Sequence, residues 1–147
     1  ATFLDEAVEL LQPYRFALVF ENKLVPGYVT EKIVNAFLAG SIPIYWGSRA
    51  VLDLFNPEAF VYANEIQGAG DDYLPQDPLL GLERVVDFVM KLALDANGLR
   101  RMATAPVVDA ARLQRYFSWH RSVRQGLLGD KVLGASLPTR ISEALTG

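Results

Sequence analysis

The sequence has no cysteine among its 147 residues, and it has one histidine, His120. The absence of cysteine excludes a disulfide scaffold, a thiol nucleophile and any metal or iron–sulfur site that needs thiolate ligands. A single histidine without cysteine cannot supply the ligands of a typical zinc site. Because disulfides form in oxidising compartments, a chain without cysteine fits a reducing one better.

Other patterns are missing as well. No run of 18 apolar, uncharged residues is present, so the sequence predicts no bilayer-spanning helix. The first residues, ATFLDEAVELL, are acidic rather than basic, unlike a signal peptide. Neither G-x-G-x-x-G nor G-x-x-x-x-G-K-[ST] occurs, which argues against a dinucleotide fingerprint and a P-loop.

The composition is that of a globular domain, with 51% apolar and 21% charged residues. The charges are distributed unevenly. Residues 1–96 carry 14 acidic and 6 basic side chains, whereas residues 97–147 carry 3 acidic and 8 basic ones. A basic end is compatible with an acidic partner or a membrane surface, or with a solvated helix. Its arginines spread around a predicted helix at 107–127 instead of forming one stripe, so we expect no nucleic-acid partner.

Hydrophobic patterning predicts an α/β domain. Apolar runs rich in branched and aromatic residues indicate strands at 14–21, 41–47 and 59–64. Helical spacing covers 3–12, 30–40, 48–55, 79–95, 97–106 and 107–127, with Thr30 and Ser48 as expected N-caps. This alternation predicts a Rossmann-like parallel sheet flanked by helices. We expect one domain over 1–147, helical in its C-terminal third, 107–145.

The segment from Phe20 to Ser48 carries the most chemistry. A strand leads into a polar loop that opens a helix, and ligands of parallel sheets bind at such carboxyl ends. Lys32 would bring a positive charge to a diphosphate, and Glu31 could accept hydrogen bonds from sugar hydroxyls. Asn22 and Tyr28 lie at the two ends of the loop. The pattern fits a nucleotide diphosphate site, although an ordinary helix start remains an alternative.

The stretch FALVFENKLVPGYVTEKIVNAFLAGSIPIYWGS resembles the signature block of the α-1,3/4-fucosyltransferases, glycosyltransferase family ten. The family pattern begins with a strand that ends in E-N, followed by a variable loop and then Y-x-T-E-K. A helix with A-L-x-A-G comes next, and then a strand of the type I/V-P-I/V-x-x-G. The departures are Lys23, where Ser is frequent, and Pro26-Gly27 in the loop. The matching residues are Glu21, Asn22, Tyr28, Thr30, Glu31, Lys32, Ala36, Ala39, Gly40, Pro43 and Gly47.

The resemblance implies the C-terminal, donor-binding half of a GT-B enzyme, which transfers fucose from GDP-fucose to a glycan hydroxyl with inversion. By position, Lys32 would bind the diphosphate and stabilise it as the leaving group. Asn22, Tyr28 and Glu31 would bind the donor, and Glu21, Thr30 and Trp46 are further candidates. No metal and no cofactor besides the donor are expected.

In this family the general base is a carboxylate of the N-terminal acceptor domain, to which nothing here corresponds. We therefore expect the chain to bind GDP or GDP-fucose and to transfer little. A non-catalytic nucleotide- or sugar-binding module and a transferase for another nucleotide sugar remain alternatives. Within the resemblance, the missing cysteines favour a bacterial, cytoplasmic enzyme, and the basic C-terminal third leaves peripheral association with the inner membrane open.

Overall fold

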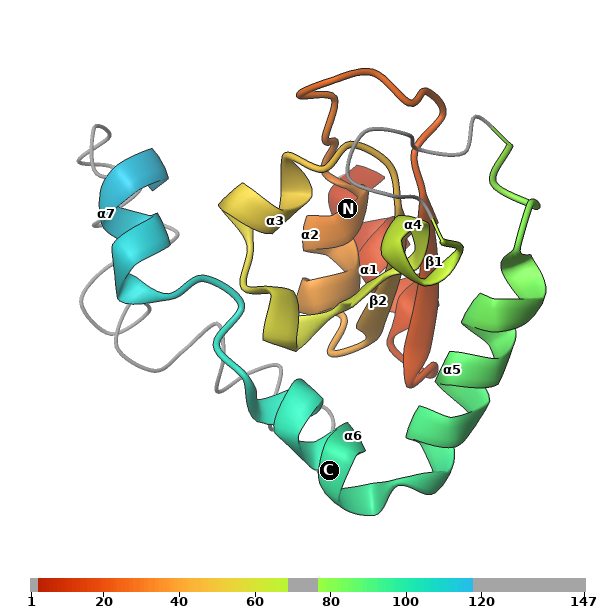
Figure 1. The fold of residues 1–147 in the computed structure, drawn as a ribbon. Coiled ribbons are helices and arrows are strands. Elements are labelled where there is room, and N and C mark those ends of the chain that lie inside the picture. Colours follow the sequence, from red (N-terminus) through yellow and green to blue (C-terminus); the bar gives the residue numbers. More distant parts are fainter. Residues whose placement is uncertain (1–2, 69–76, 118–147) are drawn as a thin grey trace.

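The computed structural model describes residues 3–68 and 77–117 (Figure 1). Its strands are β1 (Phe16–Phe20), β2 (Ile42–Trp46) and β3 (Val61–Tyr62). Its helices are α1 (Phe3–Leu11), α2 (Lys32–Leu38), α3 (Val51–Leu54), the 3-10 turn η1 (Pro57–Ala59), α4 (Ala63–Ile66), α5 (Leu82–Leu94), α6 (Ala96–Thr104) and α7 (Ala110–Phe117).

The strands of the described residues form one parallel sheet in the order β1-β2-β3. The register pairs Phe16 with Ile42 through Phe20 with Trp46, and Ile44 and Tyr45 with Val61 and Tyr62. The α/β prediction is confirmed. Since the strands run in one direction, Phe20, Trp46 and Tyr62 end together at the carboxyl edge of the sheet.

Helices cover both faces of the sheet (Figure 1). On one face, Ala17, Val19 and Tyr45 pack in a core with Ile33 and Phe37 of α2. On the other face, a second core joins the even-numbered residues of β2 to apolar residues of α5 and α6. The alternation of side chains along a strand produces this division, because neighbouring residues point to opposite faces.

The two longer strands differ in burial. All five residues of β2 are buried, as expected for the central strand. β1 is less buried: Ala17 and Val19 are each 3% exposed, whereas Leu18 on the opposite face is 72% exposed. Phe16 and Phe20, on the same face as Leu18, are half-buried against the second core. β1 is an edge strand within the described part of the chain, and the middle of this face is left uncovered.

The predicted helix caps lie one and two residues before the residues that precede α2 and α3, which are Glu31 and Ala50 and make no capping hydrogen bond. Thr30 Oγ1 still accepts from Lys32 N at 3.5 Å and also donates to Glu21 Oε2 at 2.7 Å. Ser48 Oγ likewise accepts from Ala50 N at 3.3 Å and from Gly27 N at 2.9 Å. The predicted strand 59–64 is shorter because its backbone turns into α4 at Ala63.

The C-terminal part agrees with the predicted helices. α5 lies inside the predicted helix 79–95, and α6 begins one residue before the predicted helix 97–106 and ends inside it. The Asp95 side chain caps α6, because it accepts from Gly98 N at 3.0 Å. α7 lies inside the predicted helix 107–127. The rest of that prediction, including His120, lies outside the described residues. Within residues 3–68 and 77–117, no helix is long and apolar enough to cross a membrane.

Candidate functional site

Glu21, directly after β1, holds the segment that leads into α2. It is only 5% exposed, and its Oε1 accepts from Thr30 N at 2.8 Å. Its Oε2 accepts from the Thr30 hydroxyl at 2.7 Å. Both carboxylate oxygens are therefore engaged by Thr30, near the end of the loop, and the two ends of the loop are joined.

Lys32 turns back to the same strand end. Its Nζ donates to Phe20 O at 3.0 Å and to Asn22 Oδ1 at 2.9 Å. An ammonium group has three N–H donors, and no third acceptor lies within reach among the described residues. The structure thus brings Asn22 and Lys32 into contact. One donor of the cation remains for a further acceptor.

The loop between β1 and α2 contains a tight turn over residues 25–28. Tyr28 N donates to Val25 O at 3.0 Å, and Gly27 has a φ of 78°. Pro at the second position and a left-handed Gly at the third are typical of a type II turn. At the tip, Gly27 N donates to Ser48 Oγ at 2.9 Å. The loop is thereby tied to the end of β2.

Two buried tyrosines support this edge from β2 and β3. Tyr45 OH donates to Glu21 Oε1 at 3.3 Å, and Tyr62 OH donates to Gly47 O at 3.2 Å. Burial, followed by the charge of Glu21 and this hydrogen bond, raises the pKa of Tyr45 far above its ordinary value. Burial raises the pKa of Tyr62 to about 12. Both phenols therefore stay protonated donors at neutral pH.

The remaining predicted site residues are placed in different ways. Glu31 is exposed beside Lys32, and Tyr28 is half-buried in the loop, neither with a side-chain hydrogen bond to a described residue. Trp46 is 4% exposed and packs against Phe20 with the ring centroids 6.2 Å apart. Its Nε1 has no hydrogen-bond partner among the described residues. Trp46 is thus part of the second core at the edge that carries Lys32.

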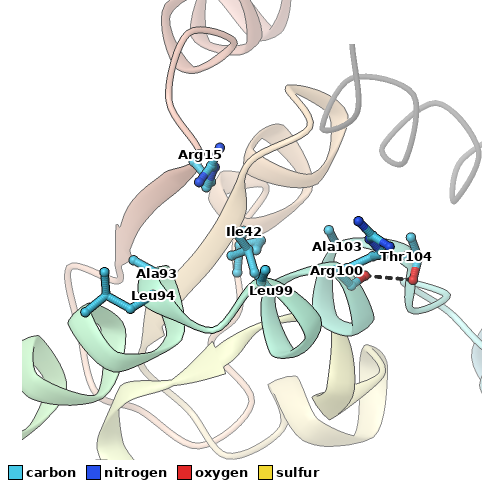
Figure 2. A pocket seen from close by; sticks show the side chains of 9 residues that line it. Arg15, Ile42, Ala93, Leu94, Leu99, Arg100, Ala103 and Thr104 are labelled. Atoms are coloured by element: carbon cyan, nitrogen blue, oxygen red, sulfur yellow. Dashed lines mark hydrogen bonds between the residues drawn. The ribbon is translucent and has the colours of Figure 1, made fainter.

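A separate cavity of about 490 Å³ lies at the amino edge of the sheet, next to α5 and α6 (Figure 2). Ile42, Leu99 and Ala103 give it an apolar floor, and Arg15 and Arg100 stand at its rim. This edge is opposite to the one that carries Lys32. Within the described residues, no cluster of His, Asp or Glu could hold a metal ion.

The fold and this edge define a class: a parallel α/β domain with a fixed cation where the first strand meets the following helix. The model of the C-terminal domain of glycosyltransferase family 10 (fucosyltransferase) matches residues 3–71. Residues 3–71 therefore match the C-terminal domain of glycosyltransferase family 10, and the resemblance of the signature block to this family is confirmed.

Individual relatives agree with this assignment. An α-(1,3)-fucosyltransferase of Helicobacter pylori is 46% identical over 68 residues, covering 45% of this chain and 14% of the relative. An α-(1,3)-fucosyltransferase of Drosophila melanogaster is 27% identical over 139 residues, which are 94% of this chain and 25% of the relative. The chain thus spans a quarter or less of the length of these two enzymes.

The fold also matches a solved structure. The crystal structure of an α1,3-fucosyltransferase with GDP-fucose superposes with a TM-score of 0.57 and 33% sequence identity. The superposition covers 71% of this chain and 27% of that protein. The Rossmann-like architecture of the GT-B type is therefore shown for the described part of the chain.

Sequence reasoning did not anticipate the long-range contacts of Ser48 and Tyr45. Ser48 is predicted as a helix cap, yet its hydroxyl also accepts from Gly27 across a separation of 21 residues. Tyr45 is one of several apolar positions of a strand, although its hydroxyl reaches Glu21. Only the phenol itself could have drawn attention to this position, because a buried hydroxyl needs a partner.

Proposed function

We propose that this chain supplies the GDP-fucose-binding half of an inverting fucosyltransferase. The observation that supports the proposal best is Lys32, whose ammonium is held by Phe20 O and Asn22 Oδ1 at the carboxyl edge of a parallel sheet. This residue lies within the family-matched segment 3–71. A relative of the same fold is described with GDP-fucose bound, at 33% identity.

In this proposal Lys32 uses its remaining N–H group to bind a diphosphate oxygen. Preorganised positive charge of this kind stabilises the negative charge that develops on the departing diphosphate. Glu31, exposed beside it, accepts hydrogen bonds from hydroxyls of the ribose or fucose. Asn22 acts through Lys32 by holding its ammonium, and Tyr28 lines the donor pocket.

Transfer of fucose also requires a general base for the acceptor hydroxyl, and we propose that a separate acceptor domain provides it. The acceptor is a glycan that this domain binds. We expect the 147-residue chain to bind GDP and GDP-fucose and to transfer little by itself. Cytoplasmic location and peripheral association with the inner membrane are further parts of this proposal, with the basic C-terminal third as their support.

Titration calorimetry of the chain with GDP, GDP-fucose and UDP tests the donor assignment. We expect GDP and GDP-fucose to compete for one site and UDP to bind at least about tenfold more weakly, a difference of about 1.4 kcal/mol. Binding in the presence of EDTA should be unchanged, since we propose no metal. Preference for another nucleotide sugar would support the alternative transferase instead.

A radiolabelled transfer assay with the same chain tests the division of labour. We expect no release of GDP coupled to an added N-acetyllactosamine acceptor. Robust transfer would contradict a base on a separate domain. If GDP binds, and addition of a complete acceptor domain still restores no transfer, the alternative of a non-catalytic binding module is favoured.

A further inference from the structure

Glu21 is a buried carboxylate, and none of the donor contacts proposed above involves it. It is 5% exposed, and both of its oxygens accept hydrogen bonds from protein groups. A buried carboxylate costs several kcal/mol in desolvation unless it is well hydrogen-bonded. Its place next to Asn22 in the sequence would otherwise favour a direct donor contact. Its burial points to a role inside the protein.

Three consecutive residues at and just after the end of β1 contact the start of α2. The backbone carbonyl of Phe20 and the side chain of Asn22 both accept from Lys32 Nζ. The buried carboxylate of Glu21, between them in the sequence, accepts instead from Thr30. Glu21 thus holds the backbone at Thr30, two residues before Lys32. The ammonium group at the end of the Lys32 side chain is held by Phe20 and Asn22.

We propose that Glu21 is a positioning residue that acts through Thr30 to hold Lys32 in place for the donor diphosphate. This inference rests on the proposed function. The charge of Glu21 strengthens its hydrogen bonds to Thr30, because hydrogen bonds to an ionised acceptor are roughly twice as strong as neutral ones. With the Thr30 backbone held, the Lys32 ammonium is preorganised and loses less entropy when the diphosphate binds.

The structure offers a matched pair of hydroxyl groups with which to separate this role from general stability. Thr30 Oγ1 and Tyr45 OH each donate one hydrogen bond to Glu21, at 2.7 Å and 3.3 Å. Only Thr30 lies on the path to Lys32. Tyr45 belongs to the buried face of β2 and carries no proposed donor contact.

The experiment measures GDP affinity by calorimetry, with thermal unfolding as the folding control. We expect Thr30→Val and Glu21→Gln each to weaken GDP binding about tenfold, since each removes a charge-assisted hydrogen bond. We expect Thr30→Ser to bind within about twofold of the wild type, because it keeps the hydroxyl. Tyr45→Phe should lower the melting temperature and leave GDP affinity within the same twofold limit.

The double variant Glu21→Gln/Thr30→Val decides whether the two residues act as one unit. Residues in one network are non-additive, so we expect the double variant to lose about tenfold, not about a hundredfold. An additive loss would make Thr30 a direct donor contact and overturn the role of Glu21. Equal losses for Tyr45→Phe and Thr30→Val would show that stability alone is involved.

Two outcomes separate this inference from the proposed function. Wild-type binding of GDP with unchanged affinity in Glu21→Gln and Thr30→Val overturns the positioning role only. Failure of the folded wild-type chain to bind GDP overturns the proposed function, and the positioning role with it.

Discussion

The two edges of the sheet contain positive charge in different settings. At the carboxyl edge, Lys32 is half-buried and held by two acceptors from the end of β1. At the amino edge, Arg15 and Arg100 are exposed at the rim of an apolar cavity of about 490 Å³ (Figure 2). Thr104 beside them hydrogen-bonds only within its own helix, to Arg100 O at 2.8 Å.

The volume of the cavity and the charge at its rim are weaker evidence for a donor site than the hydrogen-bond network at the carboxyl edge. The cavity has the size of a small-molecule pocket, yet its cations have no described partner that orients them. The carboxyl edge has a network that joins residues distant in the sequence, such as Gly27 with Ser48. Preorganised groups stabilise developing charge better than mobile ones, because no reorganisation is needed on binding.

The largest difference between the edges should appear on removal of a cation. Lys32→Met retains the aliphatic stem and should weaken GDP binding about 100-fold, the loss expected for a strong hydrogen bond to a charged group. Arg100→Met, the matched change at the cavity, should leave GDP affinity unchanged. Calorimetry measures both. Equal losses of GDP affinity in both variants would contradict a donor site at the carboxyl edge. A loss for Arg100→Met alone would indicate that GDP binds in the cavity.

A methyl group added at each edge should change stability by different amounts. A Cβ at Gly47 would stand 2.6 Å from Tyr45 OH and 2.8 Å from Glu21 Cγ. Gly47→Ala should therefore destabilise the fold by about 2 kcal/mol, as overpacking in a core does. Gly98→Ala in α6 meets the movable carboxylate of Asp95 and gains helix propensity, so its change should stay within about 1 kcal/mol. Urea unfolding measures both, and similar losses would contradict the tighter packing of the carboxyl edge.

Alkaline pH should also act on the carboxyl edge. The pKa of Tyr62 rises from 10.0 to about 12 in the folded chain. Between these values the unfolded chain releases a proton that the folded chain retains, so stability is full below pH 10 and is lost as the pH rises through 12. Each such tyrosine contributes a slope of about 1.4 kcal/mol per pH unit. Tyr62→Phe should reduce the slope of the unfolding free energy by this amount, and an unchanged slope would contradict the burial of a protonated phenol.

The smallest difference concerns two hydroxyl groups. Ser48 accepts from Gly27 N at 2.9 Å and from Ala50 N at 3.3 Å. Ser48→Ala should cost about 1 kcal/mol and speed amide hydrogen exchange at Gly27, because the loop loses its tie to β2. Thr104→Val in α6 should change stability by at most about 0.5 kcal/mol, since its hydrogen bond is local and exposed. Unchanged exchange at Gly27 in the Ser48 variant would show that the loop is held by other contacts.

Much of the carboxyl edge could be predicted from the sequence, and what could not be predicted has a physical cause. The order of strands and helices follows from local hydrophobic patterns, as for β2 and α5. The sequence predicted only the contacts of Thr30 and Ser48 at the helix starts and missed their bonds to Glu21 and Gly27, because a hydroxyl near a helix start has two kinds of partner. Local capping competes with longer-range acceptors or donors, and the choice depends on which segments fold next to it.

Burial was harder to predict than strand position. The run FALVF is apolar throughout, and nothing in it distinguishes Leu18, at 72% exposed, from Ala17, at 3%. An edge strand and a central strand have the same local composition, because the neighbours that bury one face come from elsewhere in the chain.

The sequence by itself determined that a strand runs up to Glu21-Asn22 and that a helix starts close to Lys32, since strand, turn and helix each depend on local residues. It also carried the resemblance to the family, because the signature block is contiguous. Only the tertiary structure decided that Glu21 points inward to Thr30 and Tyr45, and that Asn22 meets Lys32. Those contacts depend on where β2 and the loop lie in space, and the pairing of distant segments is set by packing rather than by any local pattern.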